Sequence, residues 1–176
     1  MEVNGDHKFK ASRDKVWQIL MNQEALQKSL PGCERFEVVG DNQFEVTMKV
    51  GVASIKGSYN GKISMNDIQE PTHYILKVEG SGGQGFLQGE GSFDLSEEGE
   101  GDKFRTVVKY KGTANVGGTL AGIGARMLQP VAKMMAGNFF KSMEKQLKEQ
   151  DGASSVEETE AEKSQASVVA TEAQTS

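Results

Sequence analysis

Residues 44–50, FEVTMKV, alternate without interruption between apolar and polar side chains. Successive residues of a strand point to opposite faces, so this stretch predicts a strand with one apolar face. The alternation recurs in 55–65, 74–78, 87–95 and 106–110, and residues 2–10 are expected to form a first strand. One apolar and one polar face predict an antiparallel sheet covered on one side only.

Three helices are expected beside this sheet. Ser12 can cap the first helix, which carries Val16 and Trp17 on its apolar face, and a second short helix covers 23–28. Residues 118–149 carry apolar side chains at helical spacing and predict a single helix about 45 Å long. One strand, two short helices, a series of strands and a long helix together make an α+β fold.

Charge is distributed unevenly along the chain. The formal net charge is −5, and segment 151–176, with six acidic residues and one basic residue, accounts for all of it. That segment has no aromatic residue, and such a composition predicts disorder. We therefore expect one domain at 1–150 and a disordered acidic tail at 151–176. The balanced charge of 1–150 argues against a nucleic-acid partner.

The compartment is predicted from what the sequence lacks. It has one cysteine, Cys33, and therefore no internal disulfide, which fits a reducing compartment. No run of about 18 apolar residues predicts a transmembrane segment. The first residues lack the apolar stretch of a signal peptide. These features predict a cytoplasmic protein.

Residues with catalytic or metal-binding potential are few and scattered. His7, His73 and Cys33 are far apart in the sequence and predict neither a nucleophile beside a base nor a zinc site. Glu90 lies in the glycine-rich strand, three residues before Phe93, so the two side chains point to opposite faces. Because Phe93 is expected to face inward, we expect Glu90 to face water. The sequence therefore predicts no catalytic residue, no metal and no cofactor.

One segment matches a nucleotide-binding pattern by its letters. Residues 80–85, GSGGQG, fit G-x-G-x-x-G. A dinucleotide site requires a helix to begin directly after the glycines. Residues 86–95 instead alternate like a strand, so we expect a glycine-rich hairpin here.

Space between the sheet and the long helix is the expected functional feature. Gly57, Gly61, Gly89 and Gly91 remove side chains from the inward face, and four of the eight methionines lie on the long helix. A plain packed core would give the same pattern, so both interpretations stay open. The residues expected to line an apolar ligand cavity are Val46, Met48, Tyr59, Ile63, Leu76, Val78, Val108, Leu120, Ile123, Met127, Val131 and Met134.

Several short segments together resemble a known family. They are Val16-Trp17, Leu30-Pro31-Gly32-Cys33, the 80–85 hairpin, and GGTLAGIGAR at 117–126 followed by Phe139-Phe140. In order and spacing they resemble the carbon monoxide dehydrogenase CoxG-like family of the START-like (SRPBCC) helix-grip superfamily, over residues 1–150. The resemblance implies a curved antiparallel sheet wrapped around a long C-terminal helix, with an apolar cavity between them.

The same resemblance implies a partner. Proteins of this kind serve a molybdenum hydroxylase of the carbon monoxide dehydrogenase type, in maturation, membrane recruitment or electron transfer to quinone. We therefore expect a non-enzymatic accessory protein that binds a lipid or quinone. We expect it in the cytoplasm, where it can contact the inner face of the membrane peripherally. The alternative is a protein-interaction adaptor with a filled core. A hydrolase or cyclase on the same fold would need an inward acid or base.

Overall fold

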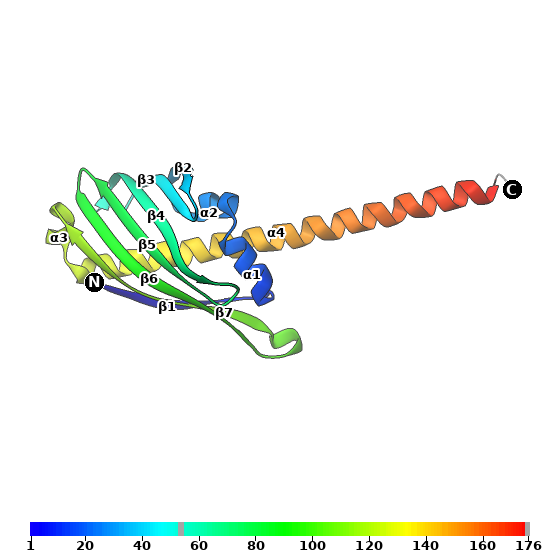
Figure 1. Ribbon diagram of the computed structural model, residues 1–176, viewed down its shortest axis with the longest axis horizontal. Coiled ribbons are helices and arrows are strands. Elements are labelled where there is room, and N and C mark those ends of the chain that lie inside the picture. The colour runs from blue at the N-terminus through cyan, green and yellow to red at the C-terminus, as the bar shows by residue number, and fades with distance from the viewer. Residues whose placement is uncertain (53–54, 175–176) are drawn as a thin grey trace.

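The computed structural model of the chain describes residues 1–52 and 55–174, with side chains described as far as residue 150. Figure 1 shows a curved sheet that arches over one long helix. The elements are, in chain order, β1 (Glu2–Phe9), α1 (Arg13–Leu20), α2 (Gln23–Ser29), β2 (Cys33–Gly40), β3 (Gln43–Val50), β4 (Gly57–Gln69), β5 (His73–Gly82), β6 (Gly85–Glu98), the 3-10 turn η2 (Gly101–Lys103), β7 (Arg105–Gly117), α3 (Thr119–Ile123) and α4 (Ala125–Gln174).

The sheet has seven antiparallel strands in the order β1-β7-β6-β5-β4-β3-β2. Its most extended pairing joins β6 to β7, from Phe86 opposite Gly117 to Glu98 opposite Arg105. Helix α4 runs through the hollow of the sheet, and α1 and α2 lie beside it (Figure 1). This arrangement confirms the predicted α+β fold with two short helices after the first strand.

One strand is absent from the sequence-based prediction. The edge strand β2 carries Val38 and Val39 side by side, and both side chains are about half exposed. Its pairing with β3 is also interrupted by two register shifts. An irregular edge strand does not alternate between buried and exposed residues, so hydropathy alone could not reveal it.

The two short helices begin at side-chain caps, as expected for the first of them. The Ser12 hydroxyl accepts a hydrogen bond from the Lys15 amide at 3.3 Å, and Asn22 accepts one from Ala25 at 2.9 Å. Both helices bury their apolar side chains against the sheet and α4. The buried core cluster comprises Phe9, Ala11, Val16, Trp17, Ile19, Leu20, Ala25, Leu26, Phe44, Met65, Tyr74, Leu95, Val108, Phe140, Met143 and Leu147.

The region from residue 118 onward is two helices, which corrects the expectation of one. Helix α3 ends at Ile123, and Gly124 adopts φ 83° and ψ 155° before α4 begins at Ala125. Positive φ is incompatible with a right-handed helix and costs glycine little. Gly124 therefore allows the chain to change direction between the last strand and α4.

The backbone of α4 is described as far as Gln174. The predicted disordered acidic tail comprises 151–176, whose side chains lie outside the described residues. The domain boundary at residue 150 therefore stays a prediction. Within the described residues, none of the helices has the length and apolar character required to cross a membrane.

The segment that matches the nucleotide-binding pattern forms a hairpin, as predicted. Strand β5 ends at Gly82, β6 begins at Gly85, and these two residues face each other in the ladder. Gly85 has φ 135°, and a Cβ at this position would collide with the Gly117 carbonyl. The glycines thus serve a tight turn and a close backbone approach.

Candidate functional site

A cavity of about 370 Å³ lies between the curved sheet and helix α4. Its volume falls within the range of small-molecule sites, about 300–1,000 Å³. Helix α4 contributes Ala132, Met135, Ala136, Phe139 and Phe140 to the wall. The other apolar and glycine wall residues are Met1, Val3, Leu26, Leu30, Pro31, Phe36, Phe44, Met48, Ile63, Met65, Tyr74, Leu76, Val78, Leu87, Gly89, Gly91, Phe93, Tyr110, Gly112 and Ala114.

Small residues on both sides leave this space open. Gly91 on β6 and Gly112 on β7 face each other in the sheet, and Gly89 lies two residues away on the same face. A Cβ on Gly112 would come within 2.8 Å of the Glu90 carbonyl oxygen. Opposite them, α4 presents Ala132 and Ala136. Of the glycines expected to leave room, Gly89 and Gly91 line the cavity, whereas Gly57 and Gly61 do not.

The structure gathers four of the twelve expected wall residues around the cavity. Met48, Ile63, Leu76 and Val78 line it from β3, β4 and β5. Ile63 and Val78 are paired in the sheet, and Leu76 pairs with Met65, which also lines the cavity. Alternation along these strands was therefore sufficient to identify the inward side chains.

The expected helix residues lie elsewhere. Met127 is 59% exposed and Met134 is 47% exposed, so both face away from the sheet. Ile123 and Val131 are partly buried but do not line the cavity. The apolar stripe of α4 is wider than its buried face, and apolar character alone could not indicate which edge of the stripe turns inward. Ala132 and Ala136 were missed because alanine is compatible with either face.

Four further residues that were expected to line the cavity lie outside its wall. Val108 is fully buried in the core, and Leu120 is buried where its amide donates to the Gln84 carbonyl. Val46 is buried beside Gly61, and Tyr59 is half-buried and donates its hydroxyl to the Ile55 carbonyl at 2.7 Å. None of the four lines the cavity.

Aromatic rings that the sequence did not single out form one end of the cavity wall. Tyr74 and Phe93 stack with centroids 4.8 Å apart and planes 7° apart. Phe93 contacts Tyr110 at 6.1 Å, and Tyr110 stacks on Phe140 at 5.5 Å. All three strand residues share the inward face with Leu95 and Val108 and lie within the alternating segments, so the alternation predicted their direction but not their place in the cavity wall. Such stacked rings give this wall a defined shape.

The polar groups at the cavity are few. Burial raises the pKa of Tyr74 far above the usual range of a phenol, and burial is also the main cause of the raised pKa of Tyr110. Glu90 and Lys111 border the cavity through strand positions whose side chains are exposed. Glu90 lies 3.7 Å from Lys77 on the outer face, which confirms that it points to water. The interior of the cavity is therefore apolar, with phenol rings in its wall.

The histidines and the cysteine make structural contacts. His7 Nε2 lies 3.2 Å from Glu144 Oε2, and its ring stacks on Phe140. Burial is the main cause of the raised pKa of the Cys33 thiol, which donates to the Arg35 carbonyl. His73 lies between Asp67 and Asp94 at the β4–β5 connection. Among the described residues, no cluster of three potential metal ligands is present.

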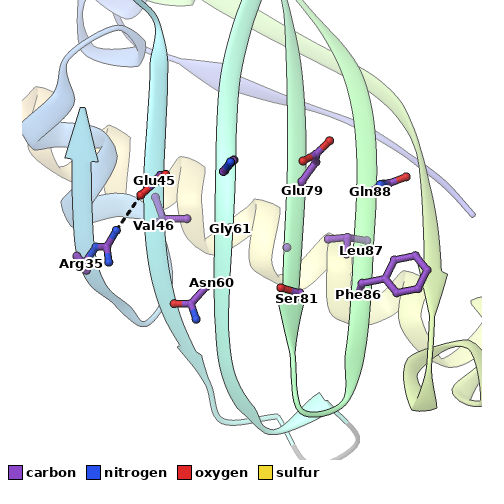
Figure 2. A pocket seen from close by; sticks show the side chains of 12 residues that line it. Arg35, Glu45, Val46, Asn60, Gly61, Glu79, Ser81, Phe86, Leu87 and Gln88 are labelled. Atoms are coloured by element: carbon purple, nitrogen blue, oxygen red, sulfur yellow. Dashed lines mark hydrogen bonds and ion pairs between the residues drawn. The ribbon is translucent and has the colours of Figure 1, made fainter. Parts of the chain in front are cut away.

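A second hollow, of about 470 Å³, lies on the outer face of the sheet. Figure 2 shows it with α4 behind the strands and with the Arg35–Glu45 ion pair at its border. Gly61 and Gly80 form its floor, while Asn60, Lys62, Glu79 and Gln88 give it a polar and charged rim. The inner cavity, with its apolar walls, is the better candidate for a small-molecule site.

Solved structures resemble this fold. A conserved protein from Geobacillus kaustophilus is 36% identical, with a TM-score of 0.80 over 85% of this chain and 96% of that chain. A START superfamily protein from Mycobacterium smegmatis is 14% identical, with a TM-score of 0.64 over 85% and 98% of the two chains. Ara h 8.0201 is 16% identical, with a TM-score of 0.60 over 84% and 97%. The last two likenesses concern the fold alone.

Among curated proteins, none matches the chain in sequence. A family model does match, over residues 5–148, from β1 to nearly the end of the part of α4 whose side chains are described. The model is that of CoxG, a subunit of carbon monoxide dehydrogenase, and members of the family are generally non-catalytic accessory proteins. With a START-like sheet closed around α4 and a cavity between them, the chain belongs to the CoxG family of carbon monoxide dehydrogenase proteins.

Proposed function

We propose that this protein is a non-enzymatic carrier of a hydrophobic ligand, of the lipid or quinone type, held between the sheet and α4. The observation that carries the proposal is the apolar cavity of about 370 Å³. A START-like fold in the CoxG family supports the same function.

The energetics of such a cavity favour a long apolar chain. Each methylene moved from water into the cavity contributes about 0.8 kcal/mol. About ten buried methylenes would contribute roughly 8 kcal/mol before the costs of association and ordering. If the cavity is formed before the ligand enters, none of this free energy is needed to open it, and micromolar binding is then the expected affinity.

The biological role that we propose is that of an accessory protein to a molybdenum hydroxylase of the carbon monoxide dehydrogenase type. Membership of the CoxG family is the support for this association. The ligand would then serve maturation, membrane recruitment or electron transfer to quinone. A cytoplasmic protein that contacts the inner membrane face peripherally suits each of these roles.

A substitution on α4 tests the carrier function. Ala136→Phe places a ring in the cavity, whereas Asn138→Phe places the same ring on the exposed side of the same helix. We expect Ala136→Phe to reduce the binding of a neutral apolar dye such as Nile red at least tenfold with little loss of stability. The control Asn138→Phe should bind the dye as the parent does.

The alternative is an adaptor with a filled core, and the same experiment distinguishes it. In a filled core, Ala136→Phe would overpack the interior and cost about 1–3 kcal/mol. If the parent also bound no dye and yielded no apolar molecule on extraction with organic solvent, the carrier function would be rejected.

A further inference from the structure

Tyr74 is a buried polar residue in the wall of the cavity. It lies on the inward face of β5, and 3% of its surface is exposed. Its ring is held between two others, stacked on Phe93 at 4.8 Å and edge-on to Trp17 at 5.7 Å. These contacts fix the ring, and with it the position of the hydroxyl on a residue that lines the cavity.

The Tyr74 hydroxyl lacks a partner within the protein. Among the residues whose side chains are described, none forms a hydrogen bond with it. Buried phenol hydroxyls usually find a partner, because an unsatisfied donor is costly. Burial also raises the pKa of Tyr74, so the group is a neutral O–H donor at physiological pH.

The other two tyrosines differ from Tyr74 in this respect. Tyr59 donates its hydroxyl to the Ile55 carbonyl at 2.7 Å. Tyr110 also lines the cavity, but its side chain is partly exposed and its hydroxyl lies over Gly5 on β1. Tyr74 is thus the most deeply buried of the three tyrosines, and no side chain or backbone group of the described residues forms a hydrogen bond with its hydroxyl.

The charge of the wall limits what can bind beside Tyr74. The charged residues that border the cavity, Glu90 and Lys111, have exposed side chains on the outer face. A carboxylate or phosphate beside Tyr74 would therefore be buried among apolar groups without a counter-charge, which is strongly unfavourable. An uncharged oxygen acceptor carries a much smaller desolvation cost.

We propose that the cavity selects an uncharged lipid with a hydrogen-bond-accepting oxygen, and that Tyr74 is the specificity-determining residue that donates to this oxygen. The inference rests on the proposed carrier function and adds the chemical class of the ligand. The apolar part of the ligand would contact Ile63, Leu76 and Val78, which follow Tyr74 along the cavity wall.

The test uses three probes of equal chain length: methyl nonyl ketone, undecane and undecanoate. Trp17 is the single tryptophan and contacts Tyr74, so its fluorescence reports binding at this end of the cavity. We expect the ketone to bind the unmodified protein roughly tenfold more tightly than undecane, as one hydrogen bond can provide. Undecanoate should bind most weakly.

Two phenylalanine variants separate the role of the hydroxyl from that of the ring. Tyr74→Phe should bind the ketone no more tightly than undecane, because the ketone oxygen is then buried without a donor. Tyr59→Phe, which changes a tyrosine outside the cavity wall, should retain the tenfold preference. Preference for the ketone in Tyr74→Phe, or tightest binding of undecanoate, would overturn the inference. Binding of none of the probes to the unmodified protein would instead reject the carrier function itself.

A measurement on the unmodified protein covers the case in which Tyr74→Phe fails to fold. With carbon-labelled tyrosine, the Cζ resonance of Tyr74 should move on addition of the ketone and much less on addition of undecane. Equal movement with both probes would show that the hydroxyl makes no bond to the ligand, and the inference would be wrong.

Discussion

His7 on β1 and Glu144 on α4 lie 137 positions apart in the sequence, yet His7 Nε2 and Glu144 Oε2 are 3.2 Å apart. The His7 ring also stacks on Phe140, one helical turn before Glu144. This contact connects the first strand to the helix that closes the cavity. It is accompanied by a hydrogen bond from Gln129 to the Glu2 carbonyl at 3.0 Å.

A double-mutant cycle on this pair should show a measurable coupling. The two side chains are 20% and 28% exposed, so water screens their interaction less than at an open surface. We expect the coupling between His7→Ala and Glu144→Ala to be about 0.5–1 kcal/mol in urea unfolding near neutral pH. Additive effects of the two substitutions would show that α4 is held by its apolar contacts alone.

Two glycines of the sheet should respond in opposite ways to alanine. A Cβ on Gly61 would lie 2.8 Å from the Glu79 carbonyl oxygen, so Gly61→Ala must displace backbone and should cost about 1–3 kcal/mol. On Gly89 the nearest atom would be 3.4 Å away, so Gly89→Ala should be neutral or stabilising by up to about 1 kcal/mol. Thermal or urea unfolding measures both. Equal losses of stability for Gly61→Ala and Gly89→Ala would contradict the prediction, because they would show that the backbone of β4 accommodates a Cβ as easily as that of β6.

His73 should make stability depend on pH at the β4–β5 connection. Its pKa is raised from 6.5, chiefly by the hydrogen bond with Asp94 at 2.7 Å. A raised pKa means that the stabilisation is complete below 6.5 and is lost as pH rises through the higher folded-state pKa. Both aspartates are more than half exposed, so the effect should be below about 1 kcal/mol.

The variant His73→Asn measures that contribution. The stability difference between the parent and this variant should be largest near about pH 6 and should shrink toward about pH 9. A difference that grows with pH would contradict the assignment, since it would require a lowered pKa.

Truncation after Gln150 tests the domain boundary. The composition of 151–176 cannot support a core, so its removal should change the melting temperature by less than a few degrees. The full-length chain is the reference, measured at the same ionic strength because the segment carries a net charge of −5. A larger decrease would place residues beyond 150 in the domain.

The sequence by itself determined the fold class and much of the sheet. Alternation fixed which side chains of β3, β4, β5 and β6 face inward, because neighbouring residues of a strand must point to opposite faces. Met48, Ile63, Leu76 and Val78 consequently line the cavity, and their contact with a ligand stays a prediction. The order of its short segments also sufficed to indicate the CoxG family.

Only the tertiary structure decided which face of α4 closes the cavity. Met127 and Met134 are as apolar as Met135, yet they are exposed, while Ala132 and Ala136 face inward. The rotation of the helix depends on its packing against β1 and α2 and on the break at Gly124, and these contacts join residues distant in sequence. The unpaired hydroxyl of Tyr74 depends on the same long-range contacts, because hydropathy records how apolar a residue is but not what lies opposite it.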